Sequence, residues 1–192
     1  MYLSILLRFT ADGLHTYLDT ATATLYQPGE ESLIPGVLEK TKGAIEYFCK
    51  TMEFDYLYRT NLSSVFDMDK MLEYLENNPV DYAGKLENAF DEYEFVSGSG
   101  YVLSRRACGV FLDHYEEIAC QHDLFDDVAT GKIMQKYVKM SYIPRVTFSY
   151  MCTFAIKNTI VKHSAICRCF VVLDVFRNVC RLERTDKVEH IK

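Results

Sequence analysis

The stretch Phe54 to Phe66, FDYLYRTNLSSVF, begins apolar and ends polar, and it predicts the fold around it. Its first half, through Tyr58, is crowded with aromatic and aliphatic residues, as in a strand that is buried on both faces of a parallel sheet. It continues without a gap into a guanidinium, an amide and hydroxyls: Arg59, Thr60, Asn61, Ser63 and Ser64. Because ligands of open α/β sheets bind beyond the carboxyl ends of the strands, these residues predict a binding site. The alternative is a strand followed by a helix that Ser64 caps.

Strands and helices alternate along the rest of the chain. We expect strands at 2–9 and 21–26, helices at 35–52, 65–77, 105–120 and 131–140, a polar connector at 85–94, and a strand-rich region from 143. The chain has 192 residues, which is enough for one core. The pattern therefore predicts a single α/β domain over residues 1–192.

Composition and charge exclude several classes of protein. The formal net charge of −6 argues against a nucleic-acid partner. No apolar run reaches the roughly eighteen residues of a membrane span, and the apolar start is too short for a signal peptide. Seven scattered cysteines among apolar neighbours are typical of a reducing compartment, and Cys167 and Cys169 lack the Cys-x-x-Cys spacing of a zinc or redox site. We therefore expect a cytoplasmic protein without a membrane span.

A second polar motif lies in the segment Phe95 to Ser104, FVSGSGYVLS. Glycine within a strand pattern permits close approach of a backbone or a ligand. Ser97, Gly98, Ser99 and Gly100 could thus present amides and hydroxyls to a sugar or phosphate. A bulge or tight turn explains the glycines equally well, and the Gly-Lys-Ser/Thr ending of a P-loop is missing.

A third motif is the carboxylate pair Asp126-Asp127, which precedes the helix expected from Gly131. Two acids at this position are typical of helix caps and of partners for the helix dipole. One of them, held in a cleft, could instead act as a general base. We expect the three motifs to converge on one cleft, with Asp127 within about 15 Å of Ser63, because reacting groups must lie near one another.

Taken in order, the strings FDYLYRTNLSS, FVSGSGYVLSRR and FDDVATG resemble the GT-A glycosyltransferases. The resemblance is to β-1,3-galactosyltransferase and fringe-type enzymes and to small glycosyltransferases of chlorella viruses, and it runs from about Leu25 to Met140. It implies a GT-A-like fold with a mixed, mainly parallel sheet and helices on both faces. It also implies a viral protein that works in the host cytoplasm.

The resemblance further implies an inverting transfer of a sugar from a UDP-linked donor to a glycan or glycoprotein acceptor. Asp127 would be the base, with Asp126 beside it. The strand end at 59–64 would bind the donor, and residues 97–100 would form the floor of the sugar pocket. Two alternatives remain: an inactive module that binds a nucleotide sugar or glycan, and a phosphate-handling hydrolase that uses the carboxylate pair.

Three departures from the family concern the metal, the carboxyl-terminal region and the amino terminus. Asn61 and Ser63 stand where the family's Asp-x-Asp holds Mn²⁺ or Mg²⁺, so we expect weak cation binding in which the diphosphate supplies most ligands. Asp67-Met68-Asp69 spells that motif, but it lies in the next helix, and we interpret it as unrelated. In the carboxyl-terminal region, His163 is a candidate for the metal or diphosphate, as are Lys162 and Arg168 for the diphosphate; solvent-facing strand residues are the simpler interpretation. The part of the chain before Ala21 is shorter than the family's first βα unit: residues 2–9 could be its strand, or that unit could be missing.

Overall fold

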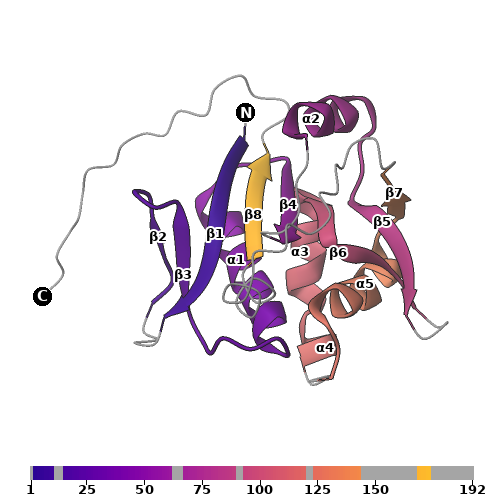
Figure 1. Cartoon of the computed structure of the whole chain (residues 1–192). Helices are drawn as coiled ribbons and strands as arrows, with labels where there is room; N and C mark the ends of the chain where they lie inside the picture. The colour runs from indigo at the N-terminus through magenta and orange to yellow at the C-terminus, as the bar shows by residue number, and fades with distance from the viewer. Residues whose placement is uncertain are drawn as a thin grey trace, which may run out of the picture.

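The computed structural model describes residues 2–10, 15–61, 67–89, 93–119, 123–143 and 168–173. Within these ranges, eight strands form one sheet in the order β2-β3-β1-β8-β4-β6-β5-β7 (Figure 1). The strands are β1 Tyr2–Thr10, β2 Tyr17–Asp19, β3 Thr24–Pro28, β4 Tyr56–Asn61, β5 Tyr82–Ala89, β6 Tyr93–Ser104, β7 Met140–Tyr142 and β8 Arg168–Leu173. The helices are α1 Gly36–Thr51, α2 Met68–Asn77, α3 Arg105–His114, α4 Glu116–Ala119 and α5 Asp126–Tyr137.

The sheet is mixed, and most of its neighbouring strands are antiparallel. Among the described strands, only the pairs β1–β3 and β5–β7 are parallel, whereas the other five pairs run in opposite directions. The expected α/β class is confirmed, but the expectation of a mainly parallel sheet is wrong. Three of the antiparallel pairs come from the β5–β6 hairpin and from β8, which enters between β1 and β4 antiparallel to both; β2–β3 and β4–β6 are the other two.

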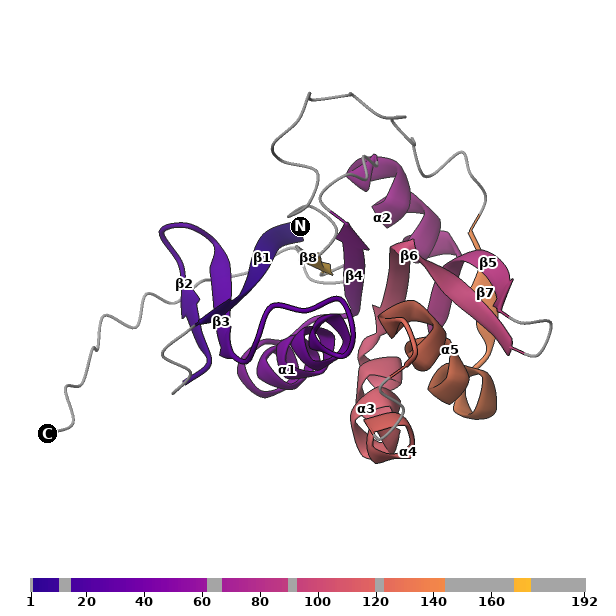
Figure 2. The same cartoon turned by 60° about the horizontal axis from the view of Figure 1, so that its bottom comes forward.

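Helices cover both faces of the sheet. Figure 2 shows α1, α3, α4 and α5 on one face and α2 on the other. Because side chains alternate along a strand, β4 contributes to both layers. Leu57 packs into the core beneath α1 and α3, whereas Tyr56 and Tyr58 pack with Met71 and Leu75 of α2. The prediction that β4 is buried on both faces is confirmed, although both of its neighbours are antiparallel.

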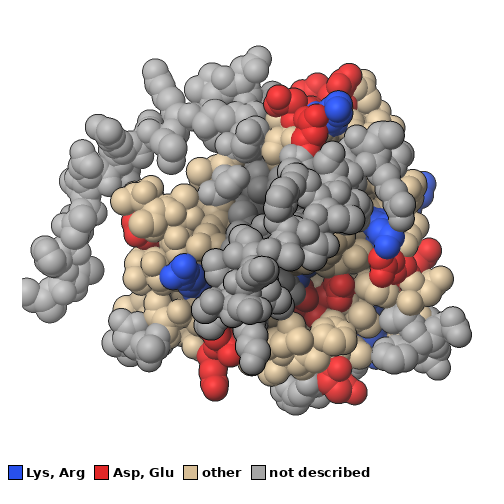
Figure 3. All heavy atoms as spheres, in the orientation of Figure 1, with Lys and Arg blue, Asp and Glu red and all other residues tan. Residues whose placement is uncertain are grey.

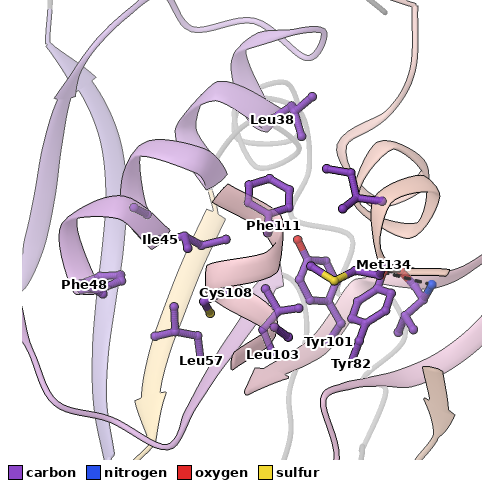
Figure 4. Packing of buried hydrophobic residues seen from close by; sticks show 14 of the residues in the cluster. Leu38, Ile45, Phe48, Leu57, Tyr82, Tyr101, Leu103, Cys108, Phe111 and Met134 are labelled. Atoms are coloured by element: carbon purple, nitrogen blue, oxygen red, sulfur yellow. Dashed lines mark hydrogen bonds between the residues drawn. The ribbon is translucent and has the colours of Figure 1, made fainter. Parts of the chain in front are cut away.

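The larger core lies between the sheet and the three helices α1, α3 and α5. Figure 4 shows the helical side chains meeting those of the strands; the labelled residues are Leu38, Ile45, Phe48, Leu57, Tyr82, Tyr101, Leu103, Cys108, Phe111 and Met134. All of them are at least 96% buried. Full burial of one such aliphatic or aromatic side chain stabilises the fold by roughly 1.5–3 kcal/mol, so this layer fixes where α5 lies on the sheet.

The polar connector expected at 85–94 is instead a hairpin. β5 continues to Ala89, β6 begins at Tyr93, and the two strands pair from Tyr82–Leu103 to Ala89–Tyr93 with one irregularity between Gly84 and Leu86. Their polar side chains include the ion pair between Lys85 and Glu87. The hairpin's backbone is satisfied by strand pairing, so it needs no continuous apolar run.

The helix expected at 131–140 begins and ends earlier, as α5. Gly131 lies inside it, close to β6, and a side chain there would overlap Phe95. This glycine therefore permits close packing of helix on strand, and it does not mark the start of a helix. Met140 belongs to β7, where it pairs with Tyr82. The helix expected at 105–120 is likewise interrupted at Tyr115, between α3 and α4.

No helix within the described ranges is long and apolar enough to cross a membrane.

Candidate functional site

The Ser97–Gly100 segment forms an irregularity in β6. Gly84 of β5 pairs with Tyr101, and Leu86 pairs with Val96, so five residue steps on β6 lie opposite two on β5. Such a bulge redirects the chain, and bulges are frequent beside active sites. The bulge interpretation is therefore confirmed, and the bulge lies beside the end of β4. Presentation of its amides and hydroxyls to a sugar or phosphate stays a prediction.

Arg59 of β4 contacts this bulge through its side chain. Its side chain is fully buried, and its guanidinium donates hydrogen bonds to the Gly98 carbonyl oxygen and to the Asp126 carboxylate. The guanidinium carbon also lies 5.2 Å from the centre of the Tyr101 ring. Burial opposes the charge of Arg59, but the Asp126 carboxylate, followed by Tyr101 and Asp127, raises the pKa of the guanidinium above its ordinary value. Arg59 is therefore a buried cation that links three elements.

Asp126 is the buried partner of that cation. It begins α5 and is 4% exposed, and its carboxylate forms the ion pair with Arg59. A buried pair of this kind is costly to break, because removal of one member leaves the other charge without compensation. The expectation that Asp126 precedes a helix starting at Gly131 is wrong; it lies in the first turn, and its charge is directed to β4.

Asp127, the next residue, faces the bulge instead. Its Oδ2 accepts the Gly98 N–H at 2.8 Å, and its Oδ1 accepts the N–H of Val128 at 3.0 Å. Burial and the neighbouring Asp126 charge raise the pKa of Asp127, and the Gly98 N–H and Arg59 oppose this shift only in part. A carboxylate has about four lone-pair positions, and these two bonds occupy two of them. Asp127 is therefore a half-buried carboxylate with lone pairs left to accept another hydrogen bond or a proton.

The β4 end and the bulge are joined by a third contact. Thr60 Oγ1 donates a 3.0 Å hydrogen bond to the Ser99 carbonyl oxygen, and Thr60 pairs with Gly100 across the two strands. A side chain at Gly100 would overlap the Tyr58 hydroxyl. The Ser99 hydroxyl lies 3.2 Å from that of Ser97, and both serines are partly exposed. The bulge thus presents two neighbouring hydroxyls above a closely packed backbone.

Asn61, the last residue of β4, fits a cation only in part. Its Oδ1 is buried and has no hydrogen-bond partner within the described part of the chain. Amide oxygens suit hard cations such as Mg²⁺ and Mn²⁺. Asp126, however, is already paired with Arg59, and the described residues contain no group of three His, Cys, Asp or Glu side chains that could hold a metal ion. Ser63 and His163, the other expected ligands, lie outside the described residues.

The string Asp67-Met68-Asp69 has a structural role at the start of α2. Asp67 is the N-cap, and its side chain accepts the Lys70 N–H at 3.1 Å. Figure 3 shows acidic atoms gathered over α2 with basic atoms among them. The position of this string on an exposed helix start agrees with its interpretation as unrelated to the metal motif. The helix starts at Met68 and not near 65, with Asp67 in the capping position proposed for Ser64.

The described parts of the three motifs therefore come together. Hydrogen bonds link the β4 end, the bulge and the acidic pair, through Arg59, Thr60, Gly98 and the two aspartates. Four of the expected site residues lie outside the described part of the chain: Ser63, Ser64, Lys162 and His163. The expected distance from Ser63 to Asp127 therefore stays a prediction. Arg168 begins β8, next to Asn61 in the strand register.

Two residues of this region were not expected from the sequence. Tyr101 lies beside the buried cation, and burial raises the pKa of its hydroxyl, so it stays neutral. Phe125 precedes the acidic pair and is 52% exposed. An aromatic residue next to two acids at a helix start was the available signal for Phe125.

No protein-family model and no curated protein matches the sequence significantly.

Proposed function

We propose that this chain is a GT-A-like glycosyltransferase that transfers a sugar from a UDP-linked donor to a glycan or glycoprotein acceptor with inversion. The observation that carries the proposal is the hydrogen bond from the Gly98 N–H to Asp127, which joins two of the three resembling motifs. Arg59 joins the third to both. A mixed sheet with helices on both faces suits this assignment.

Asp127 would act as the general base. Its raised pKa makes it a better proton acceptor than an ordinary exposed carboxylate. The acceptor hydroxyl would lose its proton to Asp127 while its oxygen bonds to the anomeric carbon. On the opposite side of that carbon, the bond to the diphosphate breaks, and its electron pair leaves on the phosphate oxygen. The configuration at the anomeric carbon is inverted.

The remaining groups would hold the reactants and the base in place. The hydroxyls of Ser97 and Ser99 and the end of β4 would bind the donor sugar and diphosphate. Arg59 would act indirectly, since its buried guanidinium fixes Gly98 and Asp126. A divalent cation, when bound, would neutralise charge on the leaving diphosphate, and Asn61 together with the diphosphate would hold it.

The test begins with donor binding. Calorimetry with UDP-glucose, UDP-galactose and UDP-N-acetylglucosamine, with and without Mn²⁺, should give binding that Mn²⁺ strengthens. Submicromolar Mn²⁺ affinity without any nucleotide would contradict the proposed cation site. Binding of a donor without turnover at any acceptor would instead identify an inactive binding module.

The second step measures turnover. Asp127→Asn should lower it by about two to four orders of magnitude with donor affinity nearly unchanged, because an amide cannot accept the proton. Asp113→Asn, at an exposed position of α3, is the matched control and should retain full turnover. Normal turnover in Asp127→Asn would reject the proposed base. Release of free sugar alone, without any glycoside product, would identify a hydrolase.

A further inference from the structure

Phe125 occupies an unusual position for an aromatic residue. It is the N-cap of α5, directly before Asp126 and Asp127, and 52% of it is exposed to solvent. Its backbone is extended there, with φ −64° and ψ 150°, and its carbonyl oxygen accepts the Ala129 N–H at 2.9 Å. Its side chain makes no capping hydrogen bond. About half of this aromatic residue is thus exposed to solvent at the start of α5, directly before the acidic pair.

Neither helix formation nor core packing explains this residue. N-cap positions favour Ser, Thr, Asp and Asn, whose oxygens accept a helix N–H, and phenylalanine lacks such an atom. Phenylalanine is also among the residues that are most often buried. Residues that break local rules without structural benefit are typical of functional sites. Here the exception lies two residues before the carboxylate that accepts the Gly98 N–H.

We propose that the Phe125 ring is the platform on which the acceptor sugar stacks; this inference rests on the proposed function. The axial C–H bonds of a pyranose form an apolar face that packs on an aromatic ring, while its equatorial hydroxyls point outward. Ligand sites commonly combine such an apolar wall with a few polar groups that set orientation. A sugar stacked on Phe125 would lie beside Asp127, which takes its proton. The acceptor is therefore a glycan that ends in a β-hexopyranoside with an unsubstituted apolar face.

A kinetic experiment tests the platform by truncation. Phe125→Ala should raise the acceptor KM about tenfold, the size of one aromatic contact, with the donor dissociation constant unchanged. Phe125→Tyr keeps the ring and should restore the wild-type KM. Since the ring is half-exposed, both variants should fold, and circular dichroism would check this. An unchanged acceptor KM in Phe125→Ala, with wild-type transfer intact, would overturn the inference and leave the proposed function standing.

A binding experiment tests it without activity. The chain contains no tryptophan, so Phe125→Trp places a single indole reporter at the site. Titration with methyl β-galactoside and methyl β-glucoside, in the presence of UDP, should change its fluorescence in a saturable way. Tyr17→Trp is the matched control: Tyr17 is 50% exposed on β2, and β3, β1 and β8 separate it from β4.

The two experiments separate the inference from the proposed function. A saturable response in Phe125→Trp alone supports the platform even if no donor is ever turned over, in which case only the enzymatic proposal fails. No response to either glycoside, or an equal response in Tyr17→Trp, would overturn the platform whatever the enzyme does.

Discussion

Arg59 and Asp126 form a buried ion pair between β4 and α5, although 67 residues separate them in the chain. The same guanidinium donates to the Gly98 carbonyl oxygen. Asp126 therefore has a fixed positive partner, whereas the adjacent Asp127 has N–H donors from the bulge and from its own helix. Two neighbouring carboxylates thus have different environments, because Arg59 forms an ion pair with Asp126, whereas Asp127 accepts backbone N–H groups.

Removal of either member of this pair should be strongly destabilising. Arg59→Met should lower the free energy of unfolding by about 3–5 kcal/mol, since it leaves the Asp126 charge buried without its partner. The double variant Arg59→Met/Asp126→Asn should recover part of that loss, and urea unfolding of all four proteins gives the coupling. Lys50→Met is the control: its partner is Glu46 on the surface, so the change should stay below about 1 kcal/mol. Strict additivity of the two buried substitutions would contradict the pairing.

Gly98 should tolerate no side chain. A Cβ there would lie 2.7 Å from Arg59 Nη1 and 2.8 Å from Asp127 Oδ2, so Gly98→Ala must displace one of them. We expect a loss of about 1–3 kcal/mol in stability, typical of overpacking. Gly109→Ala is the matched control, because no atom lies within 4 Å of a Cβ at that position of α3. It should stabilise the protein by about 0.5–1 kcal/mol, and thermal melting of both variants decides the matter. Equal melting temperatures would mean that the bulge adjusts freely.

The raised pKa of Asp127 should make part of the stability pH-dependent. Because the folded state binds the proton more tightly than the unfolded state, whose pKa is near 3.8, protonation of Asp127 stabilises the fold. That contribution is complete below pH 3.8 and is lost as the pH rises through the raised folded value. Asp127→Asn imitates the protonated form, so it should gain stability relative to wild type as the pH rises from 4 to 7. Urea unfolding across this range measures the difference.

The pH dependence of turnover should also report the raised pKa of Asp127. If Asp127 is the base, kcat/KM should fall as the pH drops through its raised pKa, at a higher pH than an ordinary aspartate would give. In the urea-unfolding experiment, a stability difference between wild type and Asp127→Asn that does not vary with pH would contradict the raised pKa of Asp127.

Cys49 should be an unusually reactive thiol. A hydrogen bond from the Cys108 thiol, aided by the charge of Arg105 and opposed by burial, lowers the pKa of Cys49 to about 7. Alkylation by iodoacetamide, followed by peptide mass spectrometry, should therefore give a rate midpoint near pH 7 for Cys49. Cys108, whose pKa burial raises, should stay unmodified in the folded protein.

The source of that shift can be tested by replacing the donor. Cys108→Ala should move the Cys49 midpoint upward toward the ordinary value of 9.0, and Cys108→Ser, which keeps a donor, should move it less. An identical midpoint in wild type and Cys108→Ala would exclude the hydrogen bond as its cause.

Local pattern was sufficient for some elements and misleading for others. The burial of β4 followed from its apolar residues on both sides, and α1 from its apolar face. Gly131 misled because its neighbour is Phe95, a contact that no local rule contains. The prediction of strand direction was wrong partly because β8, which comes from far along the chain, lies between β1 and β4 and is antiparallel to both.

The site divides in the same way. The sequence predicted which segments would be polar, and the described parts of all three meet. Their pairing depends on geometry: nothing in the string Asp126-Asp127 says that Arg59 lies under the first residue and Gly98 beside the second. Phe125 was part of a resembling string, but its exposure becomes evident only once α5 lies on the sheet.

The position of β8 also bears on how the chain folds during synthesis. In the strand register, Cys169 lies opposite Leu6 on one side and opposite Thr60 on the other. At usual translation rates, β1 leaves the ribosome on the order of ten seconds before the strand that joins it to β4. Until then the nascent chain lacks the strand that pairs with β1 and β4, so these two strands expose edges that are templates for association with other chains. Among the described strands, the one at the middle of the sheet is therefore the last to be synthesised, and the β1 and β4 edges are open to association until it arrives.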